Sequence, residues 1–155
     1  MDMSCFFIGH RDAPESLLPS LKAAVEGLLQ RQPNVRFVAG HYGRFDALAA
    51  RAVGQAKERY AQASLYLLLP YHPAERPLPL PPGFDGTLYP EGMESVPKRL
   101  AISRANRWMV EHSDYLIAWA WRPGNARSVL DAGERRARQG LLHIIRLPRE
   151  GGSTQ

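Results

Sequence analysis

With 155 residues, 45% of them hydrophobic and 23% charged, the chain has the size and balance of one globular domain. The net charge of +5 favours an anionic partner but says little about its identity. The single cysteine excludes an internal disulfide, and neither a membrane span nor a secretion signal is evident, so we expect a cytoplasmic protein without a membrane partner.

Apolar runs typical of buried strands alternate with helical patterns along the chain. The expected strands are residues 5–8, 35–39, 64–69, 115–119 and 141–147. The expected helices are residues 19–32, 46–56, 98–112 and 126–139, with Asp46 as the cap of the second. Residues 70–97 are rich in proline and lack periodicity, so they are predicted to form a long loop of the kind that covers functional sites.

The alternation of strands and helices predicts an α/β domain. We expect a Rossmann-like three-layer α/β/α architecture with a mostly parallel sheet of about five strands. The domain is expected to cover residues 1–147, and the polar tail at 148–155 is expected to be disordered. The turn after the first strand lacks the G-x-G-x-x-G spacing of dinucleotide-binding proteins, so a conventional nicotinamide-dependent dehydrogenase is not expected.

Glycines, cations and acids are concentrated in the turns that follow the expected strands. The ligand-binding candidates there are Gly9, His10, Arg11, Gly40, Gly43, Asp46, Tyr71, Gly124, Asn125, Ala126, Arg127 and Ser128. In an open parallel sheet, ligands bind outside the carboxyl ends of the strands. We therefore expect a site for a phosphate-bearing small molecule, in which Arg11 binds phosphate and Asp46 accepts from ribose hydroxyls. The alternatives are a surface arginine and an aspartate that only caps its helix.

Five short motifs carry a resemblance to a known family. They are GHR at 9–11, YGRFD at 42–46, YPEG at 89–92, VPKRLAISRANRWMV at 96–110 and SDY at 113–115. Together they resemble the YpsA-like proteins of the SMF/DprA–LOG (SLOG) superfamily, over about residues 4–147. The resemblance implies a Rossmann-like fold and a nucleotide or nucleotide-derived ligand. Within the superfamily, the LOG enzymes are phosphoribohydrolases that release a base from a nucleoside monophosphate, and DprA members bind single-stranded DNA.

The loop after the fourth strand is similar to the P-G-G-x-G-T-x-x-E motif of the LOG enzymes. Residues 123–131 read PGNARSVLD, so the Pro-Gly pair matches and Asp131 stands in the place of the catalytic glutamate. Ser128 replaces threonine, and Asn125 and Arg127 replace two glycines. Backbone N–H groups at a helix start still favour phosphate there, and Arg127 would add positive charge. The resemblance makes Asp131 a catalytic candidate.

Charged residues on the helix at 98–112 are further candidates. Arg104 and Arg107 are three residues apart and share a helix face, and Asn106 lies between them. Such a face, aimed at the crevice, would hold phosphates or stabilise a leaving ribose; the alternative is a solvated face. Glu91 in the proline-rich segment is a second candidate acid, because that loop can close over the site.

Metal binding, a cofactor and a reactive thiol are not predicted. Three histidines follow different strands: His10, His41 and His72. No H-E-x-x-H or paired-cysteine spacing supports a metal site among them. Cys5 lies inside an apolar run and is interpreted as a small buried hydrophobe. Trp119 and Trp121 are expected on one side of their strand, in the core or, alternatively, in base stacking or the contact of a homodimer.

The leading functional hypothesis is that the protein is a sensor or regulatory module that binds a nucleotide-like small molecule, such as ADP-ribose. The alternative is a nucleoside monophosphate phosphoribohydrolase, with Asp131, Arg104 and Glu91 as its catalytic candidates. Binding of single-stranded nucleic acid is the third and least favoured hypothesis, suggested by the basic charge.

Overall fold

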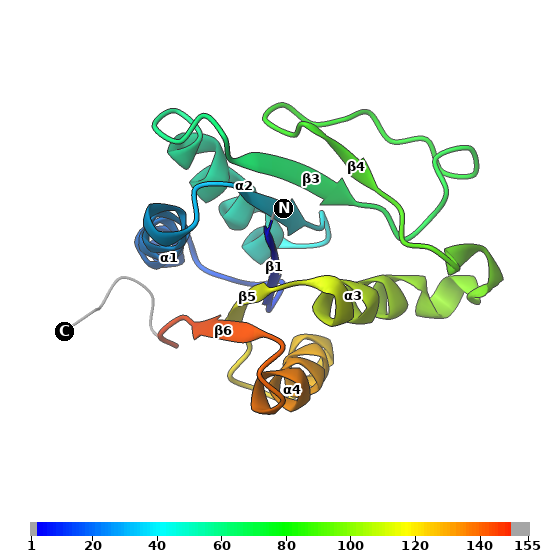
Figure 1. The fold of residues 1–155 in the computed structure, drawn as a ribbon. Helices are drawn as coiled ribbons and strands as arrows, with labels where there is room; N and C mark the ends of the chain where they lie inside the picture. Colours follow the sequence, from blue (N-terminus) through cyan, green and yellow to red (C-terminus); the bar gives the residue numbers. More distant parts are fainter. Residues whose placement is uncertain (1–2, 150–155) are drawn as a thin grey trace.

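The computed structural model describes residues 3–149, and these form a three-layer α/β/α domain around a parallel sheet (Figure 1). The strands are β1 (Met3–Gly9), β2 (Val35–Ala39), β3 (Ser64–Leu68), β4 (Gly86–Leu88), β5 (Tyr115–Trp119) and β6 (His143–Arg146). All five neighbouring pairs among these six strands are parallel, in the order β4-β3-β2-β1-β5-β6. The expected Rossmann-like architecture is confirmed, with six strands in place of about five.

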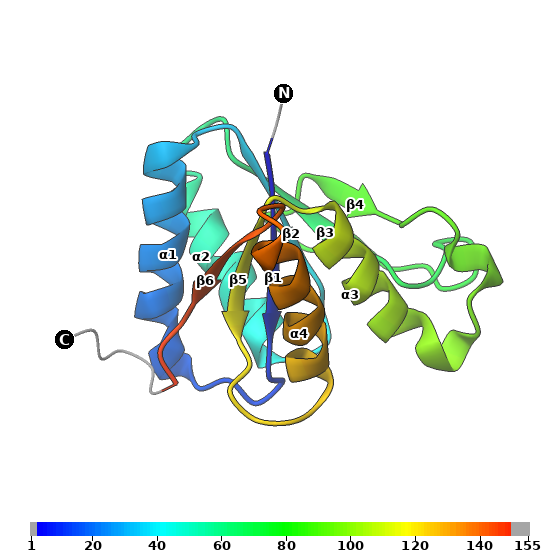
Figure 2. The same cartoon turned by 60° about the horizontal axis from the view of Figure 1, so that its bottom comes forward.

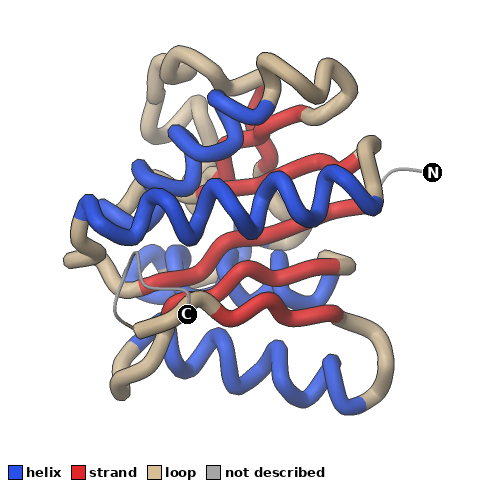
Figure 3. Tube along the Cα trace, turned by 90° about the vertical axis from the view of Figure 1, so that its left-hand side faces the viewer, coloured by secondary structure: helices blue, strands red, loops and turns tan. Residues whose placement is uncertain are grey.

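Two helices cover each face of the sheet. They are α1 (Leu18–Arg31), α2 (Arg44–Ala56), α3 (Ala101–His112) and α4 (Asn125–Arg138), with 3-10 turns at Glu15–Leu17, Met93–Ser95 and Lys98–Leu100. Figure 2 shows α1 and α2 on one side of the strands and α3 and α4 on the other, and Figure 3 shows the strands running side by side between them. No helix within residues 3–149 is long and apolar enough to cross a membrane.

Alternate side chains of the central strands enter separate cores on the two faces. Cys5 and Phe7 of β1 pack with α1 and α2, whereas Phe6 and Ile8 pack with α3 and α4. This period of two explains why β1 is a continuous apolar run, because both faces of a parallel sheet are covered. Burial also raises the pKa of the Cys5 thiol, as expected for a packed hydrophobe rather than a nucleophile.

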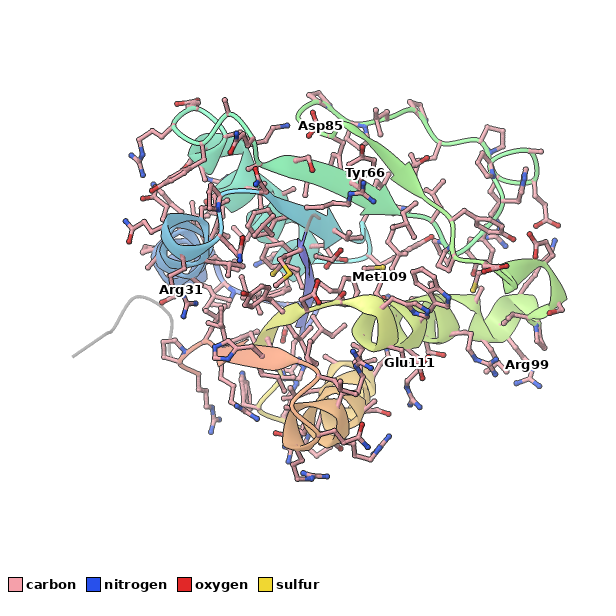
Figure 4. The ribbon with its side chains drawn as sticks, viewed as in Figure 1. Arg31, Tyr66, Asp85, Arg99, Met109 and Glu111 are labelled. Atoms are coloured by element: carbon pink, nitrogen blue, oxygen red, sulfur yellow. The ribbon has the colours of Figure 1, made fainter. Side chains whose placement is uncertain are left out.

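The proline-rich segment is not entirely loop, which corrects the prediction for residues 70–97. β4 pairs with β3 through Tyr66–Gly86, Leu67–Thr87 and Leu68–Leu88. Asp85 holds the start of the strand, because its Oδ2 accepts from the N–H of Leu65 (2.8 Å) and from Nζ of Lys57 (2.7 Å). Figure 4 labels Asp85 and Tyr66 at this edge.

Two helices begin two or three residues away from their predicted starts, and part of the predicted tail is described. α2 begins at Arg44 with Gly43 as its N-cap, so Asp46 lies inside the first turn. α3 begins at Ala101, after a 3-10 turn that occupies the predicted first residues. The carbonyl oxygens of Pro148 and Arg149 accept from Nε1 of Trp119 at 3.1 Å each. The disorder predicted for 150–155 lies outside the described residues.

The strand order reverses beside β1. The chain runs outward from β1 to β4 on one side, then returns to β5 on the other side of β1. Neighbouring crossovers therefore diverge at β1 and β5, and ligands of open parallel sheets bind at such a point, beyond the carboxyl ends of the strands. Figure 2 shows β1 and β5 ending at the edge where α4 begins.

Candidate functional site

A cleft of about 290 Å³ lies at this reversal point. The loops that follow β1, β2, β3 and β5 meet there, and α3 forms one wall. The predicted ligand-binding residues that line it are Gly9, His10, Arg11, Gly40, Asp46, Asn106, Gly124, Asn125 and Ala126. Its volume is at the lower end of the range for small-molecule sites, about 300–1,000 Å³. Turns far apart in the sequence thus form one concave surface.

The N-terminus of α4 opens onto this cleft. Gly124 is the N-cap with φ +146°, and no side chain caps the helix. Gly124, Asn125 and Ala126 line the cleft. The first N–H groups of an α-helix have no partner within the helix, and the helix dipole is positive at that end. This end of the cleft is therefore suited to an anion.

Two arginines, Arg11 and Arg122, add positive charge to the cleft, and they differ in whether an ion pair holds the guanidinium. Nη2 of Arg122 lies 2.8 Å from Oδ1 of Asp12, and its guanidinium lies 5.0 Å from the ring centre of Trp121. Arg11 is exposed and belongs to none of the ion pairs formed within residues 3–149. Arg122 is therefore held in place, whereas the Arg11 guanidinium is free to bind an anionic ligand.

Gly43 supports Arg11 rather than lining the cleft. The N–H of Arg44 donates to the carbonyl of Arg11 at 2.9 Å. A Cβ on Gly43 would lie 2.8 Å from Cα of Arg11, so only glycine permits this approach. The loop after β2 thereby fixes the loop after β1.

Asp46 supplies the acidic group that lines the cleft. Its Oδ2 accepts from the N–H of Tyr42 at 3.1 Å, and a Cβ on Gly40 would lie 2.9 Å from the same oxygen. Burial raises the pKa of Asp46 to about 6, against the opposing effects of the Tyr42 N–H and of the positive charge on Arg11. Asp46 is thus not the helix N-cap that was expected, because its carboxyl reaches back beyond Gly43.

His10 holds the turn that precedes α4. Its backbone N–H donates to the carbonyl of Trp119 (3.2 Å), and its Nε2 accepts from the N–H of Arg122 (3.3 Å). The ring lies edge-on to Trp119 and to Trp121, with both centroid separations 5.4 Å. Burial, and then the positive charge of Arg122, lower the pKa of His10, which favours the neutral ring that this acceptor role requires.

The structure places two predicted arginines away from the cleft. Arg104 and Arg107 do share a face of α3, but with Glu91 they line a separate hollow of about 520 Å³. Ile102 and Asn106, four residues apart, occupy the side of α3 that faces the cleft. At about 100° per residue, a helix cannot present both sets to one site. This corrects the expectation that the cationic face is aimed at the crevice.

The predicted site residues in the first turn of α4 also fall on two sides, one toward the cleft and one away from it. Asn125 and Ala126 line the cleft, whereas Arg127 and Ser128 are exposed and do not. Nε of Arg127 lies 3.2 Å from Oδ1 of Asp131 in an ion pair one turn apart on the helix surface. The predicted catalytic acid is therefore absent from the lining of the cleft. Tyr71 is also outside it, in a neighbouring hollow.

Several residues of the cleft lining were not predicted. They are Phe7, Ile8, Tyr42, Leu68, Pro70, Ile102, Ala105, Arg122 and Pro123. Arg122 comes shortly after a strand, which is the signal that identified Arg11, and it was available in the sequence. Ile102 and Ala105 could not be found in that way, because they become part of the site only when α3 packs against the sheet.

The other histidines and the tryptophans have local partners. His41 packs against Tyr42, with ring centres 4.1 Å apart, and Nδ1 of His72 accepts from the N–H of Ala74 at 3.0 Å. Residues 3–149 contain no group of three or more histidine, cysteine, aspartate or glutamate side chains able to hold a metal ion. Trp119 and Trp121 do lie on one side of the chain, with ring centres 6.0 Å apart, and Trp119 is buried in the core.

Comparison with known proteins assigns no family to this chain, so its function must be argued from the geometry of the cleft. No protein-family profile matches this chain, and no curated protein is similar to it in sequence.

Proposed function

We propose that the cleft binds a nucleotide or a nucleotide-derived molecule through its phosphate group, as part of a sensor or regulatory module. One observation carries the proposal: the uncapped N-terminus of α4 lines the same cleft as Arg11, which belongs to no ion pair within residues 3–149. Backbone N–H groups at a helix start, together with an arginine, are a common phosphate-binding combination. Arg122, already oriented by Asp12, adds a second cation.

An acid in the same cleft supports a ribose. Asp46 lines the cleft from α2, and one of its oxygens is already engaged by the Tyr42 N–H. Its other oxygen is available to accept from a sugar hydroxyl. An isolated carboxylate would repel a bare phosphate, so a ligand that combines phosphate with hydroxyl groups fits this charge distribution better than inorganic phosphate does.

Titration calorimetry of ribose 5-phosphate, AMP and ADP-ribose tests the proposal. We expect at least one of them to bind, and Arg11→Gln to weaken that binding by roughly ten- to a hundredfold, the loss typical of a hydrogen bond to a charged group. Arg127→Gln is the matched control, because Arg127 is an exposed arginine in the first turn of α4 that does not line the cleft. No binding of any of the three ligands would rule the proposal out.

The role of Asp46 has its own test. If its carboxyl accepts from the 2′-hydroxyl, AMP binds more tightly than 2′-deoxy-AMP. Asp46→Asn should reduce that difference, because it removes the charge from the acceptor. An unchanged preference in the variant would place the 2′-hydroxyl elsewhere in the cleft.

A further inference from the structure

A second hollow adjoins the cleft, and its lining includes three aromatic rings. It has a volume of about 220 Å³ and is lined by residues that include His41, Tyr42, Pro70, Tyr71, Arg76 and Leu78. Tyr42 and Pro70 line the cleft as well, so the two spaces share a wall. We call this space the aromatic hollow.

The rings of the aromatic hollow are fixed by contacts with one another and with Lys98. The Tyr71 hydroxyl donates to the carbonyl of Lys98 at 3.2 Å, which sets the position of its ring. The guanidinium of Arg76 lies 3.9 Å from the centre of that ring. On the other wall, the His41 ring packs on Tyr42 with centres 4.1 Å apart. The hollow therefore offers flat surfaces that are already in place before any ligand enters.

Two side chains of the hollow, one polar and one apolar, have groups without a partner among the described residues. Nδ1 of His41 is buried and has no hydrogen-bond partner within the described residues. Leaving such a group unsatisfied is unfavourable, so a hydrogen-bonding ligand beside this ring would be stabilised. Leu78 is 41% exposed, which leaves an apolar side chain at the hollow in contact with water. A flat ring with polar edges would complement both.

We propose that the aromatic hollow is the base-binding part of the site, so that the ligand is a nucleoside phosphate rather than a sugar phosphate. This inference rests on the proposed function, because it needs a phosphate at α4 and a sugar beside Asp46. The base then passes Tyr42 and Pro70 and stacks on the layer formed by the Tyr71 ring and the Arg76 guanidinium over it. Aromatic side chains bind bases mainly by stacking, which tolerates different bases, and the exposed guanidinium of Arg76 adds donors for oxygen or nitrogen acceptors on the base.

The cleft itself offers an alternative location for the base. Ile102 and Ala105 of α3, with Leu68, form an apolar wall there. The rings that line the cleft are those of Phe7, which is fully buried in the core, of His10, which holds the turn before α4, and of Tyr42, which also lines the aromatic hollow. Stacking therefore favours the aromatic hollow. Substitutions of Tyr71 in the hollow and of Ile102 in the cleft distinguish the two locations.

Calorimetric titration of AMP and of ribose 5-phosphate provides the test. We expect the unmodified protein to bind AMP roughly 5- to 100-fold more tightly, the range that stacking of one base supplies. Tyr71→Ala should remove most of this preference, through weaker binding of AMP. Tyr71→Phe, which keeps the ring and loses only the hydroxyl, should retain it.

The outcomes separate the inference from the proposed function. If ribose 5-phosphate binds but the AMP preference is unchanged in Tyr71→Ala, or is lost instead in Ile102→Ala, the base lies inside the cleft and this inference is wrong. If neither compound binds the unmodified protein, the proposed function fails first. Circular dichroism and the affinity for ribose 5-phosphate show whether each variant keeps its fold.

Discussion

Gly43 and Arg11 meet backbone to backbone: a Cβ on Gly43 would lie 2.8 Å from Cα of Arg11, and the next N–H, that of Arg44, donates to the Arg11 carbonyl at 2.9 Å. This contact joins the loops that follow β1 and β2. It means that a residue outside the cleft sets the position of the free arginine inside it.

Gly43→Ala is expected to lower the free energy of unfolding by about 2–4 kcal/mol, because a φ of +147° strains any other residue and the new methyl group meets backbone. Gly124→Ala is the matched control. Gly124 has nearly the same φ, +146°, but open space around the added carbon. Chemical denaturation should show the smaller loss for Gly124→Ala, and equal losses would mean that the contact with Arg11 contributes nothing.

Gly9→Ala should also destabilise the protein, through a side chain rather than the backbone. A Cβ at Gly9 would lie 2.3 Å from the ring of Phe45, which is fully buried at the start of α2. The ring would have to move within a close-packed core, at a cost of about 1–3 kcal/mol. Gly27→Ala in α1 provides the contrast, since no atom lies within 4 Å there. That helix should gain up to about 1 kcal/mol, and thermal denaturation distinguishes the two signs.

The fold could be predicted because its signals are local. β1, β2 and β5 are short apolar runs, and each is followed by a polar turn that contains glycine. β4 has no such signal: it has three residues, begins with glycine and follows a run of prolines. It forms because Asp85 bonds to Leu65 and Lys57, residues about 20 to 28 positions earlier in the chain. Such long-range contacts leave no periodic pattern in the sequence.

The site was predictable to the extent that it follows strand ends. Arg11, Asp46 and Asn125 were found by that rule, and all three line the cleft. Arg104 and Arg107 were assigned by spacing alone, which identifies a shared helix face but not its direction. α3 carries apolar side chains on both sides, including Ile102 toward the cleft and Trp108 toward the other hollow. The rotation of such a helix is fixed by packing against the sheet, so the sequence could not decide which side faced the cleft.

Asp131→Asn should leave ligand affinity unchanged, because Asp131 pairs with Arg127 on the surface of α4 and does not line the cleft. The loss of an exposed ion pair one turn apart should change the unfolding free energy by no more than about 0.5 kcal/mol. Calorimetry with the best ligand checks the first statement and denaturation the second. A large loss of affinity would show that Asp131 reaches the ligand after all, as the LOG resemblance implies.

Asp46→Asn should make the protein more stable at pH 8 and give no advantage at pH 4. The folded-state pKa of about 6 lies above the ordinary value of 3.8, so the folded protein binds the proton more readily than the unfolded chain does. Stability from this group is therefore present at low pH and is lost as the pH rises through about 6. Asparagine removes the charge and keeps an acceptor for the Tyr42 N–H.

The gain of Asp46→Asn at pH 8 should be about 1–2 kcal/mol, less than the full shift would give because the cleft admits water. Urea denaturation of both proteins between pH 4 and pH 8 measures the difference. A difference that does not change with pH would mean that the Asp46 carboxyl titrates near its ordinary pKa.

His10 should produce the opposite pH dependence. Its pKa is lowered in the folded protein, mainly by burial and further by Arg122, so the unfolded chain takes up the proton first as the pH falls. Stability is therefore lost as the pH falls from about 6.5 toward the folded-state pKa.

His10→Gln removes this titration and keeps a side-chain acceptor for the N–H of Arg122, whereas His10→Phe leaves that N–H without its partner. At pH 8 we expect His10→Phe to cost about 1–3 kcal/mol and His10→Gln less. Between pH 7 and pH 5 the unmodified protein should lose stability relative to both variants, because neither carries a titrating ring. Parallel pH profiles for all three proteins would show that His10 does not titrate differently on folding.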